Sequence, residues 1–442
     1  MADFVLRNVR IVELGPGPGW AGPVDLVVEQ GVVQNIGHRL DRPLGIEEYD
    51  GEGRWLVPGL WDQHVHLAQW TARGQRLDLS GSESPEHAVA RVRDHLAEHP
   101  GTLVSTGHRI GTWRTEPTVA ALDAVAPDVP VVLIAGDGHH AWLNSRALER
   151  LDLPPREGVV AENEWYEAYT RIEAVLAPDV SPAAYRRTLE RAAALGIVGV
   201  VDLERGQTPA DWESREPPVR VRVSTYADGS GSGAPNQTSP ELAGLLDRAH
   251  NHGLEVATHA IGDRALDDAL AAYDVTGASG SIEHVQLVTR SAVKTMARLN
   301  LRASVQPAHL LDDRDVTELI WPDRADRCFA FRWMLDDGVE LALGSDAPVS
   351  PLDPWLAIAA AVHRSDDERS AWHPEQALTA REALAASVDG RGSVHAGMPA
   401  DLVLLEADPL AEHLDTASAS VALRSMPVAL TVVAGETAFS AL

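Results

Sequence analysis

The sequence predicts an α/β protein, namely a (β/α)8 TIM barrel with a composite β-sandwich domain built from both termini. Through the middle of the chain, short apolar strand patterns alternate with longer helical patterns, which is typical of βα units around a parallel sheet. Both ends of the chain contain strand patterns without helices. Several of the central strands end on His or Asp, and (β/α)8 barrels assemble their sites at that end of their strands.

The size and composition of the chain suit this architecture. Its 442 residues, 45% hydrophobic and 23% charged, are enough for one barrel and a smaller domain. No apolar run approaches the roughly 18 residues of a membrane span, and "MADFVLRNVR" lacks the apolar core of a signal peptide. We therefore expect a soluble, cytoplasmic protein. Because Cys328 is the single cysteine, any bound metal must be held by His and carboxylate groups.

The charge of the chain restricts its partners. A net charge of −28, from 65 acidic and 37 basic residues, argues against nucleic acid, whose phosphates would be repelled. An acidic surface suits solubility or the attraction of a cationic substrate. We expect a small-molecule substrate, neither nucleic acid nor membrane as a partner, and a homodimer among the compatible states.

The two ends of the chain predict one shared sheet domain. Near the N-terminus, residues 4–14 and 24–37 alternate as strands do, with a hairpin turn expected at Gln30-Gly31. Residues 400–409 and 428–439 have the same pattern, with a turn expected at Ala434-Gly435. Neither end has a core large enough to stand alone, so residues 1–57 and 395–442 are predicted to form a composite β-sandwich.

Residues 58–394 are predicted to form the barrel. The strand candidates are "GLWDQHVHL", "TLVSTGH", "VVLIAGD", "VGVVDLE", "VRVSTYA", "EVATHAI", "SIEHVQL", "RASVQP" and "ELALGSD". These are nine candidates for the eight places of a barrel. We assign "VVLIAGD" to an insertion around residues 130–191. The stretch "SPAAYRRTLERAAALG" is predicted to be a helix that begins at Ser181-Pro182 and ends at Gly196.

The strand ends carry a candidate metal site. In "GLWDQHVHL", His64 and His66 are two residues apart and face the same side of a strand, as does Asp62, which could orient them. Alone, such a pair could equally be two ordinary polar residues. Further along the chain, successive strand ends carry His259, His284 and Asp346. Imidazoles and a carboxylate are ligands that Zn²⁺ and similar divalent ions prefer. Such an ion lowers the pKa of bound water towards neutrality and yields a hydroxide nucleophile, whose proton Asp346 could accept and pass to a leaving amine.

Several motifs together resemble the amidohydrolase superfamily, in particular its branch with N-substituted formamide deformylase. They are "PGLWDQHVHL", "DGHHAWLNSRAL", "HAIGDRA", "IEHVQL", "LGSDAPVSPLDPW" and the tail "LTAREALAASVDGRGSVHAGMPADLVLLEADP". The resemblance spans essentially the whole chain. It implies a metal-dependent hydrolase with a (β/α)8 barrel and a composite β-sandwich. It also implies that the metal ligands are His64, His66, His259, His284 and Asp346.

The chain departs from this family in lacking a bridging lysine. Many binuclear members bridge two metals with a carbamylated lysine on a mid-barrel strand. Here the strand reads "VRVSTYADGS", with Ser224 near that place. The only lysine, Lys294, lies in a helical stretch after the His284 strand. Either the site holds one ion, or a carboxylate bridges two. By resemblance, Glu162 in "EGVVAENEW" is the best such carboxylate, with Asp202 and Glu204 as the next candidates.

Four further residues are candidates for substrate binding. His139 and Trp142 lie in "DGHHAWLNSRAL", which suits a lid, although Trp142 could equally sit in a core. Arg109 and Gln306 end strand candidates.

These features predict hydrolysis of a C–N bond in an amide, an N-acyl or an N-formyl compound. An aminohydrolase of this superfamily generally places a glutamate three residues after the fifth-strand His, whereas that position here is Gly262 and the nearest acid is Asp263. Lactone or ester hydrolysis uses the same chemistry and stays open. A metal-binding protein without catalytic activity is the remaining alternative, and would be favoured by the loss of a ligand position.

Overall fold

The computed structural model divides into two units, residues 1–70 with 182–442, and residues 71–181. Each unit is described by itself. The structure describes residues 3–15, 19–43, 45–74, 77–98, 100–108, 110, 113–135, 140–161, 164–165, 167–169, 171–172, 181–204, 208–224, 226–227, 239–367, 369–413 and 415–442.

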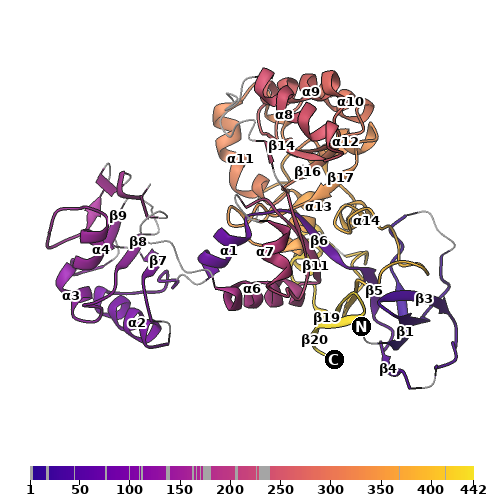
Figure 1. The fold of residues 1–442 in the computed structure, drawn as a ribbon, viewed down its shortest axis with the longest axis horizontal. Coiled ribbons are helices and arrows are strands. Elements are labelled where there is room, and N and C mark those ends of the chain that lie inside the picture. Colours follow the sequence, from indigo (N-terminus) through magenta and orange to yellow (C-terminus); the bar gives the residue numbers. More distant parts are fainter. Residues whose placement is uncertain are drawn as a thin grey trace. The chain divides into compact units, whose positions relative to one another are not determined.

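Strands from both ends of the chain pair in one sheet of eight described strands (Figure 1). Its order is β20-β19-β18-β5-β1-β2-β3, with β4 paired to β1. The C-terminal part joins the N-terminal part where β18 runs antiparallel to β5, with Leu402 opposite Pro58. The strands are β1 (Phe4–Ile11), β2 (Val24–Glu29), β3 (Val32–Gly37), β4 (Glu47–Asp50), β5 (Trp55–Pro58), β18 (Leu402–Leu405), β19 (Val428–Val433) and β20 (Glu436–Ser440).

Both hairpin turns expected in this sheet are confirmed. Gln30 and Gly31 have φ angles of 53° and 73°, and β2 pairs antiparallel with β3 around them. Ala434 and Gly435, with φ angles of 52° and 80°, connect the antiparallel strands β19 and β20. Two successive residues of positive φ form the turn whose twist matches that of the flanking strands.

The middle of the first unit contains two parallel sheets. The first has the order β12-β11-β6 and the second the order β13-β14-β15-β16-β17. A parallel bridge between Val65 and Ala347 joins the end of β6 to the segment after β17. The strands are β6 (Leu60–Val65), β11 (Ile197–Asp202), β12 (Arg220–Val223), β13 (Tyr226–Ala227), β14 (Val256–Ala260), β15 (Gly280–His284), β16 (Arg302–Val305) and β17 (Leu341–Leu343).

Helices follow these strands along the chain and pack on them in a large apolar core. The predicted helix at Ser181 is confirmed as α6 (Pro182–Ala194), and the turn after it contains Gly196 at a φ angle of 87°. The other helices are α1 (Leu67–Gly74, which crosses the unit boundary), α7 (Pro209–Glu213), α8 (Ser239–Asn251), α9 (Asp263–Thr276), α10 (Arg290–Arg298), α11 (His309–Ile320), α12 (Phe331–Asp336), α13 (Pro354–His363), α14 (Ala380–Ala385), α15 (Thr416–Arg424), and the 3₁₀ turns η2 (Ala325–Arg327) and η3 (Pro374–Gln376). Among all described helices, none is long and apolar enough to cross a membrane.

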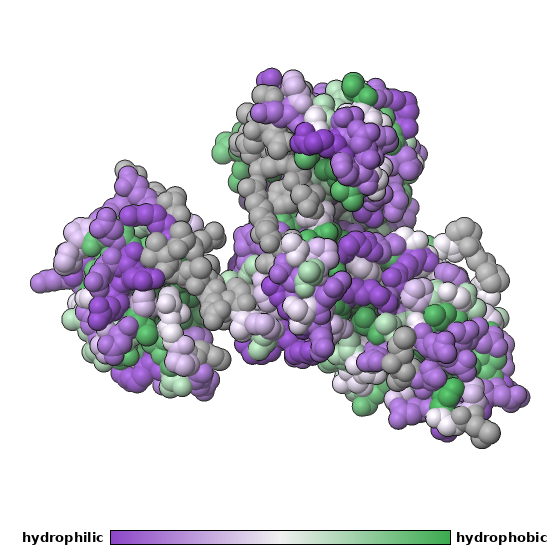
Figure 2. Space-filling view, viewed as in Figure 1, coloured by the Kyte–Doolittle hydropathy of each residue, from purple (hydrophilic) through white to green (hydrophobic). Residues whose placement is uncertain are grey.

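The second unit has its own sheet and its own cores. The sheet order is β10-β9-β8-β7, in which β7 and β8 are parallel and the other pairs are antiparallel. The sequence alone assigns β7 to the barrel and β8 to an insertion, whereas the structure pairs the two strands with each other. The elements are α2 (Pro85–Glu98), β7 (Leu103–His108), α3 (Val119–Asp123), β8 (Val131–Ala135), β9 (His140–Leu143), α4 (Ser145–Arg150) and β10 (Val160–Ala161). Figure 2 shows hydrophilic residues over much of the visible face of each unit, in keeping with the acidic composition.

Gly344, directly after β17, permits a close approach between that segment and β6. A Cβ atom at this position would lie 2.7 Å from the backbone nitrogen of His64 and 3.2 Å from Oδ1 of Asp62. Since real Cβ atoms do not approach backbone atoms so closely, any side chain here must push β6 away from β17.

We therefore expect Gly344→Ala to lower the free energy of unfolding by about 1–3 kcal/mol through overpacking. Urea unfolding followed by circular dichroism measures this change. Gly244→Ala is the matched control, because a Cβ there would meet only Arg248 Nη1 at 3.6 Å, and alanine in a helix interior is favoured over glycine by up to about 1 kcal/mol. Equal unfolding midpoints for Gly344→Ala and the unmodified protein would contradict the packing argument.

Candidate metal centre

The His64 and His66 pair lies at the end of β6 and is fastened to the segment after β17. The backbone N–H of Asp346 donates to the carbonyl of His64 at 2.7 Å, and the N–H of His66 donates to the carbonyl of Ala347 at 2.9 Å. Buried Asp62 accepts from the backbone N–H of His64 at 3.0 Å and from that of Ser345 at 3.0 Å. Burial raises the pKa of Asp62 to about 6, although these donors oppose the shift. Asp62 thus holds the backbone that carries the histidines, and does not bond to their rings.

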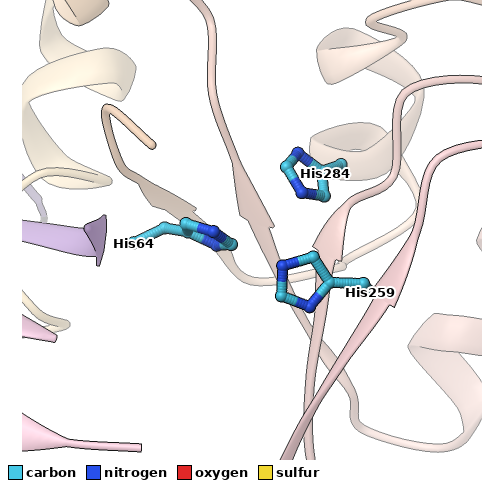
Figure 3. A group of neighbouring side chains, drawn as sticks. All are labelled: His64, His259 and His284. Atoms are coloured by element: carbon cyan, nitrogen blue, oxygen red, sulfur yellow. The ribbon is translucent and has the colours of Figure 1, made fainter. Parts of the chain in front are cut away.

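Three imidazoles from three parallel strands converge on one space (Figure 3). The ring centroids of His64, His259 and His284 are 5.0 Å apart in all three pairs. His284 closes β15 with a φ angle of 71°, and Val285 follows at 48°. Such left-handed backbone is costly for residues with a side chain, and it is concentrated at functional sites.

Asp346 brings a carboxylate to these histidines. Its Oδ1 lies 3.3 Å from Nε2 of His64 and 3.4 Å from Nε2 of His66. Five of the residues that the sequence nominated as ligands therefore lie together: His64, His66, His259, His284 and Asp346. Within each of two groups, His64–His259–His284 and His64–His66–Asp346, the ligand atoms lie within 4.8 Å of one another.

His309 belongs to the same cluster and was missed from the sequence. It is the first residue of α11, four residues beyond the end of β16, and its Nε2 lies 3.6 Å from Oδ2 of Asp346. Its ring stacks on that of His284 at 6.0 Å. With His284 and Asp346 it forms a third group of ligand atoms within 4.8 Å. The available signal was a histidine just beyond a strand end, in the same "SVQPAHL" that supplied Gln306.

Glu283 is a second residue of the site that sequence reasoning missed. It is buried, and its Oε2 accepts a hydrogen bond of 2.8 Å from Nδ1 of His64, while Ser281 Oγ donates to its other oxygen. Burial alone would raise the pKa of Glu283, but the hydrogen bond and charge of His64 outweigh burial and lower it. Because Nδ1 of His64 is engaged by this carboxylate, Nε2 is the nitrogen that remains for an ion.

The protonation of His259, His284 and Asp346 suits metal binding. Burial lowers the pKa of His259 to about 4 and that of His284 well below its usual value, helped by the charge of His64. Burial also opposes charge on Asp346, yet the neighbouring rings of His64 and His66 outweigh it and hold its pKa far below the usual value. Neutral imidazoles beside an ionised carboxylate are the forms that bind divalent cations.

Two buried nitrogen atoms indicate whether a metal ion suits this cluster. Nε2 of His64 and Nε2 of His309 are buried without a hydrogen-bond partner among the described residues. Buried polar atoms rarely lack partners, since each costs about 1–3 kcal/mol. Nitrogen donors with a carboxylate fit Zn²⁺ and related borderline ions, so the residues present fit a metal.

The other candidate residues have different surroundings. Asp202 accepts from the backbone N–H of Leu67 at 3.1 Å, and Glu204 accepts from that of Gln69 at 3.3 Å. Neither acid belongs to a metal-type group among the described residues. Gln306 is buried beside Ser304, whose carbonyl accepts from its Nε2 at 3.2 Å.

The remaining candidates lie in residues 71–181 or beyond the described residues. Trp142 is fully buried in a core of that unit, and its Nε1 donates to the carbonyl of Thr118 at 2.9 Å. Glu162, His139 and Arg109 lie outside the described residues. Their roles, like those of Trp142 and Gln306 towards substrate, stay predictions.

A parallel α/β architecture with His and Asp groups at its strand ends is typical of metal-dependent hydrolases, and comparisons with known proteins agree. A model of the amidohydrolase family matches residues 47–439. The chain is 29% identical to Protein LONG AFTER FAR-RED 3 of Arabidopsis thaliana, over 85% of this chain and 82% of that protein. It is 24% identical to N-substituted formamide deformylase of Arthrobacter pascens, over 82% and 85%. The structure of an uncharacterized metal-dependent hydrolase from Pyrococcus horikoshii superposes with a TM-score of 0.76 at 25% identity, over 93% of this chain and 99% of that one.

The chain thus belongs to the amidohydrolase family, whose members are metal-dependent hydrolases.

The contact between Glu283 and His64 predicts that Glu283→Gln weakens metal binding. The variant keeps the size of the side chain but removes the charge that favours the Nδ1–H tautomer, and loss of such an outer partner typically costs 10- to 100-fold in metal affinity. Competition with a chromophoric chelator measures the change.

Glu318→Gln is the matched control, because Oε1 of Glu318 lies 3.8 Å from Nε2 of His373, outside the cluster. We expect this control to bind metal as the unmodified protein does. A folded Glu283→Gln protein with undiminished affinity would show that His64 does not depend on Glu283.

Proposed function

We propose that this protein is a metal-dependent amidohydrolase that cleaves the C–N bond of an amide, an N-acyl or an N-formyl compound. The observation that carries the proposal is the Asp346 carboxylate within 3.3–3.6 Å of three imidazole nitrogens, those of His64, His66 and His309. His64 and His66 come from the end of β6, His309 from the start of α11, and Asp346 from the segment after β17. The deformylase relative named above supports an N-formyl or similar amide as substrate class.

We further propose that the two parallel sheets form one (β/α)8 barrel, with a β-sandwich of both termini beside it. The bridge between Val65 and Ala347 supports joining the sheets on one side. On the other side, β12 and β13 are separated by only two residues of chain. The site then lies at the carboxyl ends of the strands, where barrels of this kind hold their catalytic residues.

The chemistry divides between the ion and the residues around it. When bound, a divalent ion such as Zn²⁺ polarises a carbonyl oxygen and lowers the pKa of a water molecule. Asp346 accepts the proton of the attacking water on a carboxylate oxygen and hands it to the amide nitrogen as the C–N bond breaks. Glu283 keeps the ring of His64 oriented throughout.

The surroundings of Asp263 support an amide over a ring amidine as substrate. An aminohydrolase needs an acid that shuttles protons at this part of the site. Asp263 begins α9, and its Oδ2 pairs with Nη1 of Arg324 at 3.2 Å while its Oδ1 accepts from the backbone of Arg264. The carboxylate is therefore already engaged away from the histidines.

We predict that the protein loaded with Zn²⁺, Mn²⁺ or Co²⁺ hydrolyses N-formyl or N-acyl amines, and that chelation abolishes this activity. Ring amidines, esters and lactones serve as comparison substrates in the same assay. Faster turnover of a ring amidine than of any amide would replace the amide assignment with a deaminase.

Asp346→Asn tests the proton transfer. We expect it to reduce kcat by about 10²- to 10⁴-fold while at least one ion stays bound to the histidines, as measured by elemental analysis. Asp323→Asn, on an exposed acid paired with Arg324, is the control and should leave kcat unchanged. Substantial residual turnover in Asp346→Asn would rule out Asp346 as the proton carrier.

A further inference from the structure

We infer that a cavity beside the sheet shared by both ends of the chain binds a small zwitterion with an apolar body, such as an α-amino acid with an apolar side chain. The cavity measures about 540 Å³, and its lining includes Glu13, Trp20 and Ile36 together with residues 391–396. This volume lies within the range of small-molecule sites. Of the described residues that line it, none belongs to the metal centre, so the inference does not rest on the proposed function.

Hydrogen bonds join the N-terminal and C-terminal walls of this cavity. The backbone N–H of Leu14, just beyond β1, donates to Oγ of Ser393 at 2.9 Å. In β3, the N–H of Val33 donates to the carbonyl of Met398 at 3.0 Å, and the carbonyl of Val33 accepts from the N–H of Gly397 at 2.7 Å. Both N-terminal segments are thus tied to the C-terminal segment, so the cavity is formed before any ligand binds.

Apolar side chains supply one part of the lining. Val394 is buried in the core of the sheet, and Trp20 and Ile36 are partly buried residues that pack against that core. The ring of Trp20 also makes an edge contact with His38, at 6.0 Å between centroids and an interplanar angle of 81°. Nδ1 of His38 in turn donates to the carbonyl of Pro23 at 3.0 Å. Trp20 is therefore held in place and offers an aromatic surface to an apolar group of the ligand.

Two opposite charges line the same cavity without pairing with each other. The side chain of Glu13 makes no hydrogen bond or ion pair with any described residue. Nη1 of Arg391 pairs with Oδ2 of Asp401 at 2.7 Å. Asp401 also accepts from Arg220 through both of its oxygens, at 2.8 and 3.0 Å. Because two arginines share this one carboxylate, a positive charge remains beside the cavity.

A zwitterion complements this pair of charges. Its ammonium group would bind the carboxylate of Glu13, and its carboxylate would bind N–H groups of Arg391 that are not used by Asp401. A ligand with only a positive charge would leave Arg391 unmatched, and a ligand with only a negative charge would leave Glu13 unmatched. Charge complementarity therefore favours a ligand that carries both charges.

Isothermal titration calorimetry of the full, metal-loaded chain with L-phenylalanine tests the inference. We expect saturable binding of L-phenylalanine. Binding of 2-phenylethylamine, which lacks the carboxylate, and of 3-phenylpropanoate, which lacks the ammonium group, should each be weaker by about tenfold or more. Absence of L-phenylalanine binding, or equally tight binding of either analogue, would overturn the inference.

Glu13→Gln places the ligand in this cavity. The substitution keeps the size of the side chain and removes its charge, so binding of L-phenylalanine should weaken by about tenfold or more. Asp41→Asn is the matched control, because Asp41 is an exposed acid near the same end of the chain that does not line the cavity. It should bind as the unmodified protein does. Undiminished binding in a folded Glu13→Gln protein would contradict the assignment.

An amino acid can also bind a metal ion directly, so the metal centre needs a separate test. His64→Ala removes one nominated metal ligand, and chelation removes metal from the unmodified protein. Both proteins should still bind L-phenylalanine as the metal-loaded protein does. Loss of L-phenylalanine binding after chelation, with binding retained in metal-loaded Glu13→Gln, would place the ligand at the metal centre and overturn the inference.

Discussion

The site depends on one backbone contact, the pairing of the end of β6 with the segment after β17. Peptide groups of His64 and His66 exchange hydrogen bonds with those of Asp346 and Ala347. Asp62 reinforces this contact from inside, and the bare Cα of Gly344 permits it. Two ligand-bearing segments nearly 300 residues apart in sequence are therefore fixed to each other through the main chain. The ligand side chains of the two segments are therefore held near each other by the main chain.

Burying so many polar groups is tolerable because they compensate one another. The cluster holds His64, His66, His259, His284 and His309 with Asp346 and Glu283, most of them with little exposure to solvent. Isolated charges in such a place would be expensive. Two carboxylates flank His64 and raise its pKa to about 9 against the effect of burial, whereas burial keeps the neighbouring imidazoles neutral. A bound cation would supply the positive charge that the proton of His64 otherwise supplies beside Asp346.

Much of the site was predictable because the ends of strands can be recognised in a sequence. His64, His66, His259, His284 and Asp346 each follow an apolar run, and the structure brings them together. Glu283 was not predictable from the sequence. In a regular strand, successive side chains point to opposite faces, so Glu283 and its neighbour His284 would be expected on different faces. The left-handed backbone at His284 and Val285 breaks that alternation. His309 was missed because its position is set by how α11 begins after β16, which is a tertiary property.

The fold, like the site, could be predicted from the sequence only in part. Turns such as Gln30-Gly31 follow from local chemistry, and the pattern of βα units predicts parallel strands. The assignment of individual strands to one sheet or another depends on long-range pairing. The sequences of β7 and β8 have the same apolar strand pattern. Only the structure shows that the two strands pair with each other.

The direct passage from β5 to β6 has a consequence for synthesis of the chain. Only Gly59 separates the two strands, and β5 lies in its sheet between β1 and β18, whose residues lie beyond position 400. His64 leaves the ribosome early, whereas β18, one of the two partners of the strand before it, is made only when the chain is almost finished. Asp346 also arrives late. The complete set of nominated ligands therefore exists only after Asp346 has been synthesised.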